Sequence, residues 1–127
     1  MVGRGRRVLV VEDDASTRAL LTDALTQAGY EVRAAVGARE GLAAVVGWHP
    51  DAIVLDLVLP AVDGRAFTRA VRLDPVLGRT PILLLAAAQN DGLPAAEARV
   101  GADAELAKPP VVEELLALVA RLAGPIA

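Results

Sequence analysis

Asp56 is the residue of this sequence whose surroundings point most directly to chemistry. It separates two apolar runs, Ala52-Ile53-Val54-Leu55 and Leu57-Val58-Leu59-Pro60. A carboxylate among so many aliphatic side chains is costly to remove from water unless other groups compensate it. We therefore expect compensating groups to reach Asp56 from elsewhere in the chain.

Two other segments contain suitable groups. The apolar run Val8–Val11 leads directly into Glu12-Asp13-Asp14, and Lys108, the only lysine of the 127 residues, follows Glu105-Leu106-Ala107. If these segments and the one before Asp56 are parallel strands of one sheet, their ends meet. Three carboxylates would then share a pocket with one ammonium group, which suits a hard cation and a phosphoryl group.

Each of these residues also has a purely structural interpretation. Asp13 or Asp14 could cap the first helix, because Asp is a favoured N-cap residue. Asp56 could simply end a strand, and Lys108 could be a surface lysine before a turn. His49, the only histidine, is expected to end a helix and not to bind a metal or donate a phosphoryl group.

Composition limits the protein class. At 127 residues the chain is long enough for one domain, spanning 1–127. It is 54% hydrophobic but only 2% aromatic, so its core must be aliphatic. A net charge of −3 gives the domain no general attraction to nucleic acid or anionic membranes, and residues 1–6 are expected to be a flexible basic tail. With no cysteine and no apolar stretch of about 20 residues, we expect a cytoplasmic protein.

Apolar segments alternate between strand and helix patterns along the whole chain. This alternation predicts an α/β fold with a doubly wound parallel sheet covered on both faces. In such sheets the site lies at the carboxyl ends of the strands. The expected strands are Val8–Val11, Tyr30–Ala35, Ile53–Asp56, Ile82–Ala87 and Ala104–Ala107, and the expected helices are Ala15–Ala28, Ala38–Trp48, Arg65–Leu73, Pro94–Val100 and Val112–Ala123.

The sequence resembles the receiver domain of two-component response regulators. The matching stretches are VLVVEDD, DAIVLDLVLPAVDG, PILLLAAA and GADAELAKPP, which occur in the order and at the spacing of that family and cover nearly the whole chain. The resemblance implies a flavodoxin-like fold, with a five-stranded parallel sheet in the order 2-1-3-4-5 and five helices.

The resemblance also implies a role for each site residue. Asp56 matches the phosphoacceptor, and Glu12 and Asp13 match the acidic pair that holds Mg²⁺ together with Asp56 and the main-chain carbonyl of Val58. Lys108 matches the lysine that contacts the phosphoryl group, and its peptide bond to Pro109 is often cis in the family. The implied donor is the phosphohistidine of a histidine kinase or phosphotransfer protein, and an unidentified protein would receive the signal downstream. Such a domain catalyses only its own phosphorylation and dephosphorylation.

Two positions depart from the family pattern. Ala86 stands where the family usually has Thr or Ser, and Glu105 stands where it usually has Tyr or Phe. In the family this hydroxyl and this aromatic ring move together on phosphorylation, so we expect an atypical output switch. The alternative is a pseudo-receiver that binds partners without being phosphorylated. An aspartate-nucleophile phosphohydrolase is disfavoured because Val58 replaces its second Asp, and nucleotide binding because no glycine-rich loop follows the first strand.

Overall fold

The computed structural model describes residues 6–59, 64–87 and 101–124. These ranges contain five strands and four helices. The elements are β1 (Arg7–Val11), α1 (Ala15–Gln27), β2 (Glu31–Ala35), α2 (Ala38–Trp48), β3 (Ala52–Asp56), α3 (Gly64–Leu73), β4 (Ile82–Ala87), β5 (Ala104–Lys108) and α5 (Val112–Ala123). The fifth helix of our prediction, Pro94–Val100, lies outside the described residues, which contain the other four.

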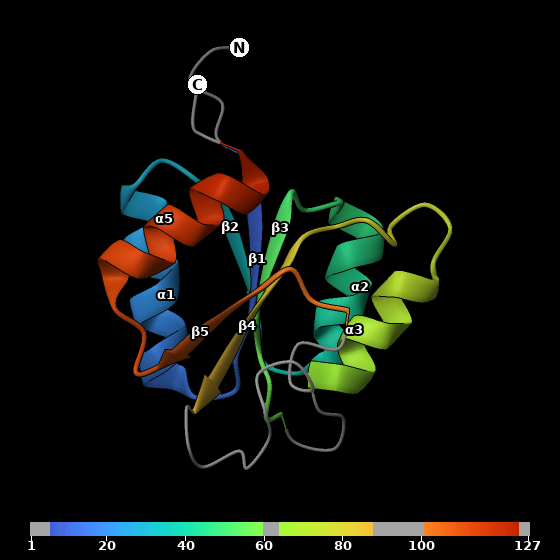
Figure 1. The fold of residues 1–127 in the computed structure, drawn as a ribbon, viewed down its shortest axis with the longest axis horizontal. Coiled ribbons are helices and arrows are strands. Elements are labelled where there is room, and N and C mark those ends of the chain that lie inside the picture. The colour runs from blue at the N-terminus through green and yellow to red at the C-terminus, as the bar shows by residue number, and fades with distance from the viewer. Residues whose placement is uncertain (1–5, 60–63, 88–100, 125–127) are drawn as a thin grey trace.

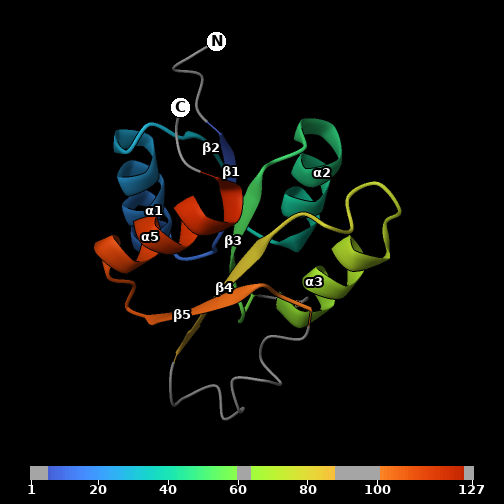
Figure 2. The same cartoon turned by 45° about the horizontal axis from the view of Figure 1, so that its top comes forward.

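The five strands form one parallel sheet in the order β2-β1-β3-β4-β5. Helices α1 and α5 cover one face of the sheet, and α2 and α3 cover the other (Figure 1). The turned view in Figure 2 keeps the two helix pairs on opposite sides. This arrangement confirms the predicted doubly wound fold and its strand order.

The core divides between the two faces because successive side chains of a strand point to opposite sides. Leu9 and Val11 face the α2–α3 side, where Phe67 is fully buried. Val8 and Val10 face the α1–α5 side. Each fully buried aliphatic side chain contributes about 1.5–3 kcal/mol, so the central strands fix the sheet that positions the site.

The helix ends agree with the expectations for Asp14 and His49, and Gly29 follows a third helix end. Asp14 is the N-cap of α1, and its carboxylate accepts hydrogen bonds from Thr17 N and Thr17 Oγ1, both at 2.8 Å. Gly29, with φ of 109°, follows the end of α1. His49, with φ of 55°, ends α2 in the left-handed conformation. Of the two candidate caps, Asp14 therefore takes the structural role.

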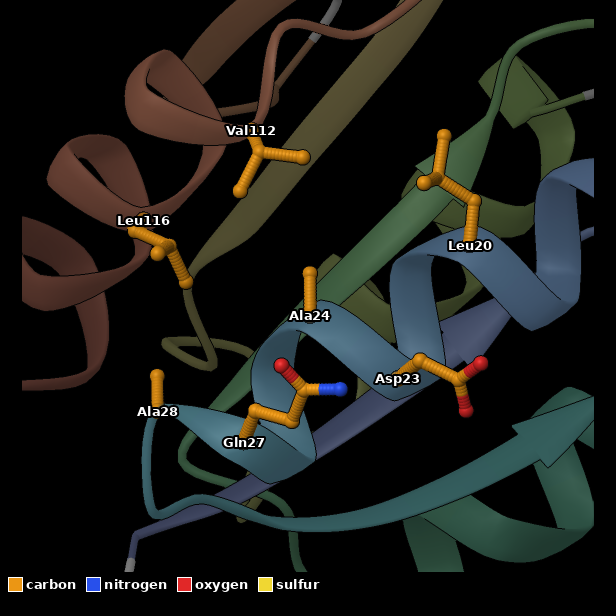
Figure 3. A pocket seen from close by; sticks show the side chains of 7 residues that line it. All are labelled: Leu20, Asp23, Ala24, Gln27, Ala28, Val112 and Leu116. Carbon is orange, nitrogen blue, oxygen red and sulfur yellow. The ribbon is translucent and has the colours of Figure 1, made fainter.

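Two remaining features lie away from the strand ends. The carbonyl of Arg6, the first described residue, accepts a hydrogen bond from Glu31 N at 2.9 Å, and residues 1–5 of the expected tail lie outside the description. A groove of about 410 Å³ lies between α1 and α5, lined by Leu20, Asp23, Ala24, Gln27, Ala28, Val112 and Leu116 (Figure 3). Within the described ranges, the helices are all too short or too polar to span a bilayer.

Candidate functional site

The sheet topology brings the predicted residues together at the carboxyl ends of the strands. Glu12 and Asp13 directly follow β1, Asp56 is the last residue of β3, and Lys108 is the last residue of β5. The register pairs Val11 with Leu55, which sets Glu12 beside Asp56. All four residues thus lie at the carboxyl ends of the strands, which is the end of the sheet to which the arrowhead of β4 points in Figure 1.

Asp56 is a buried carboxylate, only 2% exposed. Its Oδ1 accepts a hydrogen bond from Lys108 Nζ at 2.6 Å, across 52 residues of sequence. The same oxygen accepts a second hydrogen bond from Val58 N at 3.1 Å. The cost of burying this carboxylate is therefore offset by one cation and one backbone amide.

Glu12, Asp13 and Asp56 form a cluster of three carboxylates. Each offers an oxygen that lies within 4.8 Å of the others. Glu12 and Asp56 are buried, whereas Asp13 is exposed. Like charges at this separation repel one another, so the cluster favours a cation among its oxygens.

The pKa of the Glu12 carboxyl reflects its burial beside another carboxylate. Burial raises its pKa to about 7, the neighbouring Asp56 carboxylate adds to the rise, and the Asp14 amide and Lys108 oppose it. Its Oε2 accepts a hydrogen bond from Asp14 N at 3.1 Å. Its Oε1 is buried and has no hydrogen-bond partner among the described residues. A bound cation would compensate this oxygen.

The donor set fits a magnesium ion. Mg²⁺ prefers about six hard oxygen ligands in octahedral geometry and usually keeps several waters, so a few carboxylates complete its shell. The orphaned Oε1 of Glu12 and the open side of Asp13 are consistent with that coordination. Val58 lies two residues after Asp56, and its nitrogen donates a hydrogen bond to the Asp56 carboxylate. The main chain of Val58 therefore lies next to the cluster.

The two residues that depart from the family pattern, Ala86 and Glu105, lie in β4 and β5. Ala86 pairs with Ala107 next to Asp56's partner Leu85, and its methyl group packs against the core on the α2–α3 side. Glu105 is half-buried in β5, opposite Leu84. The Lys108–Pro109 peptide bond is cis, as the resemblance implied.

One residue near the site was not anticipated from the sequence. Arg18, the fourth residue of α1, donates from Nη1 to the carbonyl oxygens of Glu12 at 2.9 Å and Asp13 at 3.3 Å. Sequence reasoning assigned this arginine only to a helix. Its spacing of five residues after Asp13 is the signal that was available, because a long side chain there can reach back over the preceding turn.

The chain belongs to the response regulator receiver domain family, whose family model matches residues 8–120. The fold and the carboxylate cluster at the strand ends had already indicated this class of protein.

Individual relatives agree with the assignment. The chain is 41% identical over 126 residues to the transcriptional regulatory protein TcrA of Mycobacterium tuberculosis, a match that covers 96% of this chain and 48% of TcrA. It thus spans about half the length of that regulator and of others like it.

Two solved structures are also similar. The chemotaxis response regulator CheY4 of Vibrio cholerae is 35% identical, with a TM-score of 0.84 over 93% of this chain and 98% of CheY4. The receiver domain of the sensor histidine kinase PA1611 from Pseudomonas aeruginosa is 30% identical, with a TM-score of 0.85 over 94% of this chain and 98% of that domain. The PA1611 structure has a magnesium ion coordinated in its active-site cleft.

Proposed function

We propose that this domain accepts a phosphoryl group on Asp56 from the phosphohistidine of a histidine kinase or phosphotransfer protein. Under this proposal Glu12, Asp13 and Asp56, with the Val58 carbonyl, hold Mg²⁺. The domain acts on no separate substrate and passes its signal to a downstream protein.

The observation that supports this proposal most strongly is the environment of Asp56. The carboxylate is 2% exposed, lies 2.6 Å from the only lysine, and has two further carboxylates within 4.8 Å. Burying these charges together costs free energy, so stability alone does not explain the arrangement. The same geometry suits phosphoryl transfer, which depends mostly on positioning and on neutralising charge.

The residues divide the chemical work. A carboxylate oxygen of Asp56 attacks phosphorus, an O–P bond forms, and the N–P bond to the donor imidazole breaks. Lys108, already held at the Asp56 carboxylate, exchanges that contact for a phosphoryl oxygen. Bound Mg²⁺ supplies additional positive charge at the phosphoryl group.

Intact-mass spectrometry tests the proposal. Incubation with acetyl phosphate and Mg²⁺ should add the mass of one phosphoryl group to the wild-type chain. Asp56→Asn and addition of EDTA should each abolish the addition, while Asp23→Asn, which removes an exposed carboxylate of α1, should not. Labelling of Asp56→Asn to the wild-type extent would refute the assignment.

The alternative is a pseudo-receiver that works as a phosphorylation-independent interaction module. Ala86 and Glu105 favour it, because neither can take part in the usual hydroxyl and aromatic movement. The two functions differ in one measurement. A pseudo-receiver would remain unlabelled with acetyl phosphate and also with a panel of phosphorylated histidine kinases.

A further inference from the structure

The turn between β1 and α1 must hold two consecutive acidic residues, Glu12 and Asp13, in place at the carboxylate cluster. Their carbonyl oxygens lie beyond the end of β1, so the strand ladder does not supply their hydrogen bonds. Polar backbone groups in such a position need other donors. Arg18 supplies them, since one nitrogen of its guanidinium, Nη1, lies 2.9 Å from the Glu12 oxygen and 3.3 Å from the Asp13 oxygen.

The rest of this turn is fixed by neighbouring contacts. Glu12 N donates to the carbonyl of Ala35 at 3.0 Å, and Asp14 N donates to Glu12 Oε2 at 3.1 Å. The Asp14 carboxylate caps α1 through Thr17. The peptide units on both sides of Asp13 are therefore held, and Arg18 is the group that binds both carbonyls. Asp13 is exposed, so its position depends more on these backbone contacts than on burial of its side chain.

We propose that Arg18 is a positioning residue that preorganises Glu12 and Asp13 for a divalent cation. This inference rests on the proposed magnesium site. Outer groups that orient metal ligands typically affect metal affinity by about 10- to 100-fold. Arg18 exerts its effect through the backbone of the ligands, because the guanidinium is itself positively charged and has no attraction for Mg²⁺.

That positive charge makes the proposal easy to separate from a simple electrostatic effect. Removing a cation near a Mg²⁺ site tightens binding if charge alone matters. Removing a positioning residue weakens binding. The two interpretations therefore predict changes of opposite sign for the same substitution.

The experiment is a titration with MgCl2 at constant ionic strength, followed by NMR of backbone amides, which also reports whether each variant is folded. Arg18→Met should weaken Mg²⁺ binding by about tenfold or more, and Arg18→Lys, which retains the charge and can reach one carbonyl, should lie between Arg18→Met and wild type. Arg69→Met, which removes an exposed arginine of α3, should bind as wild type does.

Each result has a distinct meaning. Wild-type or tighter binding by Arg18→Met overturns the positioning role, and so does a loss of thermal stability without a change in affinity. If Arg18→Met does not fold, Arg18→Lys decides the question, and unchanged binding by that variant overturns the proposal. Failure of the wild-type chain to bind Mg²⁺ would instead refute the proposed metal site itself.

Discussion

Glu12 is a site residue whose pKa is raised strongly by its surroundings. Its carboxyl is buried beside Asp56, and its pKa rises from the ordinary 4.5 to about 7. The folded chain therefore binds a proton more readily here than the unfolded chain does. This proton stabilises the fold fully below about pH 4.5, and the stabilisation is lost as the pH rises through about 7.

The first prediction concerns metal-free protein. Between about pH 4.5 and 7, the free energy of unfolding should fall with rising pH more steeply in the wild type than in Glu12→Gln. Urea denaturation followed by circular dichroism in EDTA measures both. The lowered pKa values of Asp14 and Asp74 affect stability only in more acidic solution, so they do not obscure the comparison. Equal slopes in the two proteins would show that Glu12 keeps an ordinary pKa.

The second prediction is that stabilisation by Mg²⁺ increases with pH, opposite to the stabilisation by the proton on Glu12. Mg²⁺ binds the ionised carboxylates, so it competes with the proton on Glu12. The stabilisation gained from a fixed Mg²⁺ concentration should therefore be larger at about pH 8 than at about pH 5. Thermal melts with and without MgCl2 at the two pH values measure this difference, and an equal gain at both would argue against Glu12 as a ligand.

Residue types predicted which side chains meet at the carboxyl ends of the strands. Asp56, Lys108 and the acidic pair have distinctive types, and a parallel sheet necessarily brings strand ends together. The Arg18 contacts could not be predicted in the same way, because their acceptors are backbone carbonyls. Every residue has a carbonyl, so nothing in the sequence marks the two that Arg18 binds.

At the scale of elements, the start of α3 packs closely against the backbone of Asp56 and Leu57. Gly64 N donates to the carbonyl of Leu57, at 2.6 Å. A Cβ atom at Gly64 would lie 2.8 Å from Leu57 Cα and 2.9 Å from the Asp56 carbonyl oxygen. Backbone atoms cannot move aside as a flexible side chain can, so the first turn of α3 requires glycine.

The third prediction follows from this contact. Gly64→Ala should destabilise the fold by about 1–3 kcal/mol because the added methyl group forces a backbone shift. Gly47→Ala is the matched control, since a Cβ there meets nothing within 4 Å and Gly47 lies within α2. The control should be stabilised by up to about 1 kcal/mol. Urea denaturation measures both, and equal effects would contradict the steric argument.

Element boundaries from the sequence were correct to within about one residue for most of the described strands and helices. Tyr30 shows why such small differences arise. It was expected to begin the second strand, but its nitrogen donates to the Leu25 carbonyl at the end of α1, and the ladder with β1 begins at Glu31. Its buried apolar ring resembles a strand residue, although its backbone completes a helix.

At the scale of the whole molecule, the question is whether a phosphoryl group on Asp56 changes distant elements. Ala86 offers no hydroxyl to follow the phosphoryl group, and Glu105 replaces the usual ring on β5. A hydrogen bond to a charged group contributes about 1.5–3 kcal/mol. Its absence should lower the bias toward an active conformation by roughly one to two powers of ten.

The fourth prediction is a local response. Amide NMR spectra with and without beryllofluoride, which mimics the phosphoryl group, should differ near Asp56 and little across Glu105 and α5. The double variant Ala86→Thr and Glu105→Tyr should extend the changes into β5 and α5. Large shifts across α5 in the wild-type chain would contradict a weakened switch.

At the amino ends of the strands, far from the site, the single tryptophan of the chain provides a fluorescence probe. Trp48 is 4% exposed, with the guanidinium carbons of Arg33 and Arg7 at 4.8 and 5.6 Å from its ring centre, and Arg7 Nη1 donates to the Trp48 carbonyl at 2.7 Å. Its indole emission should therefore report global unfolding while remaining insensitive to events at Asp56. One native fluorophore can thus serve as a common stability gauge for every variant, loaded or not.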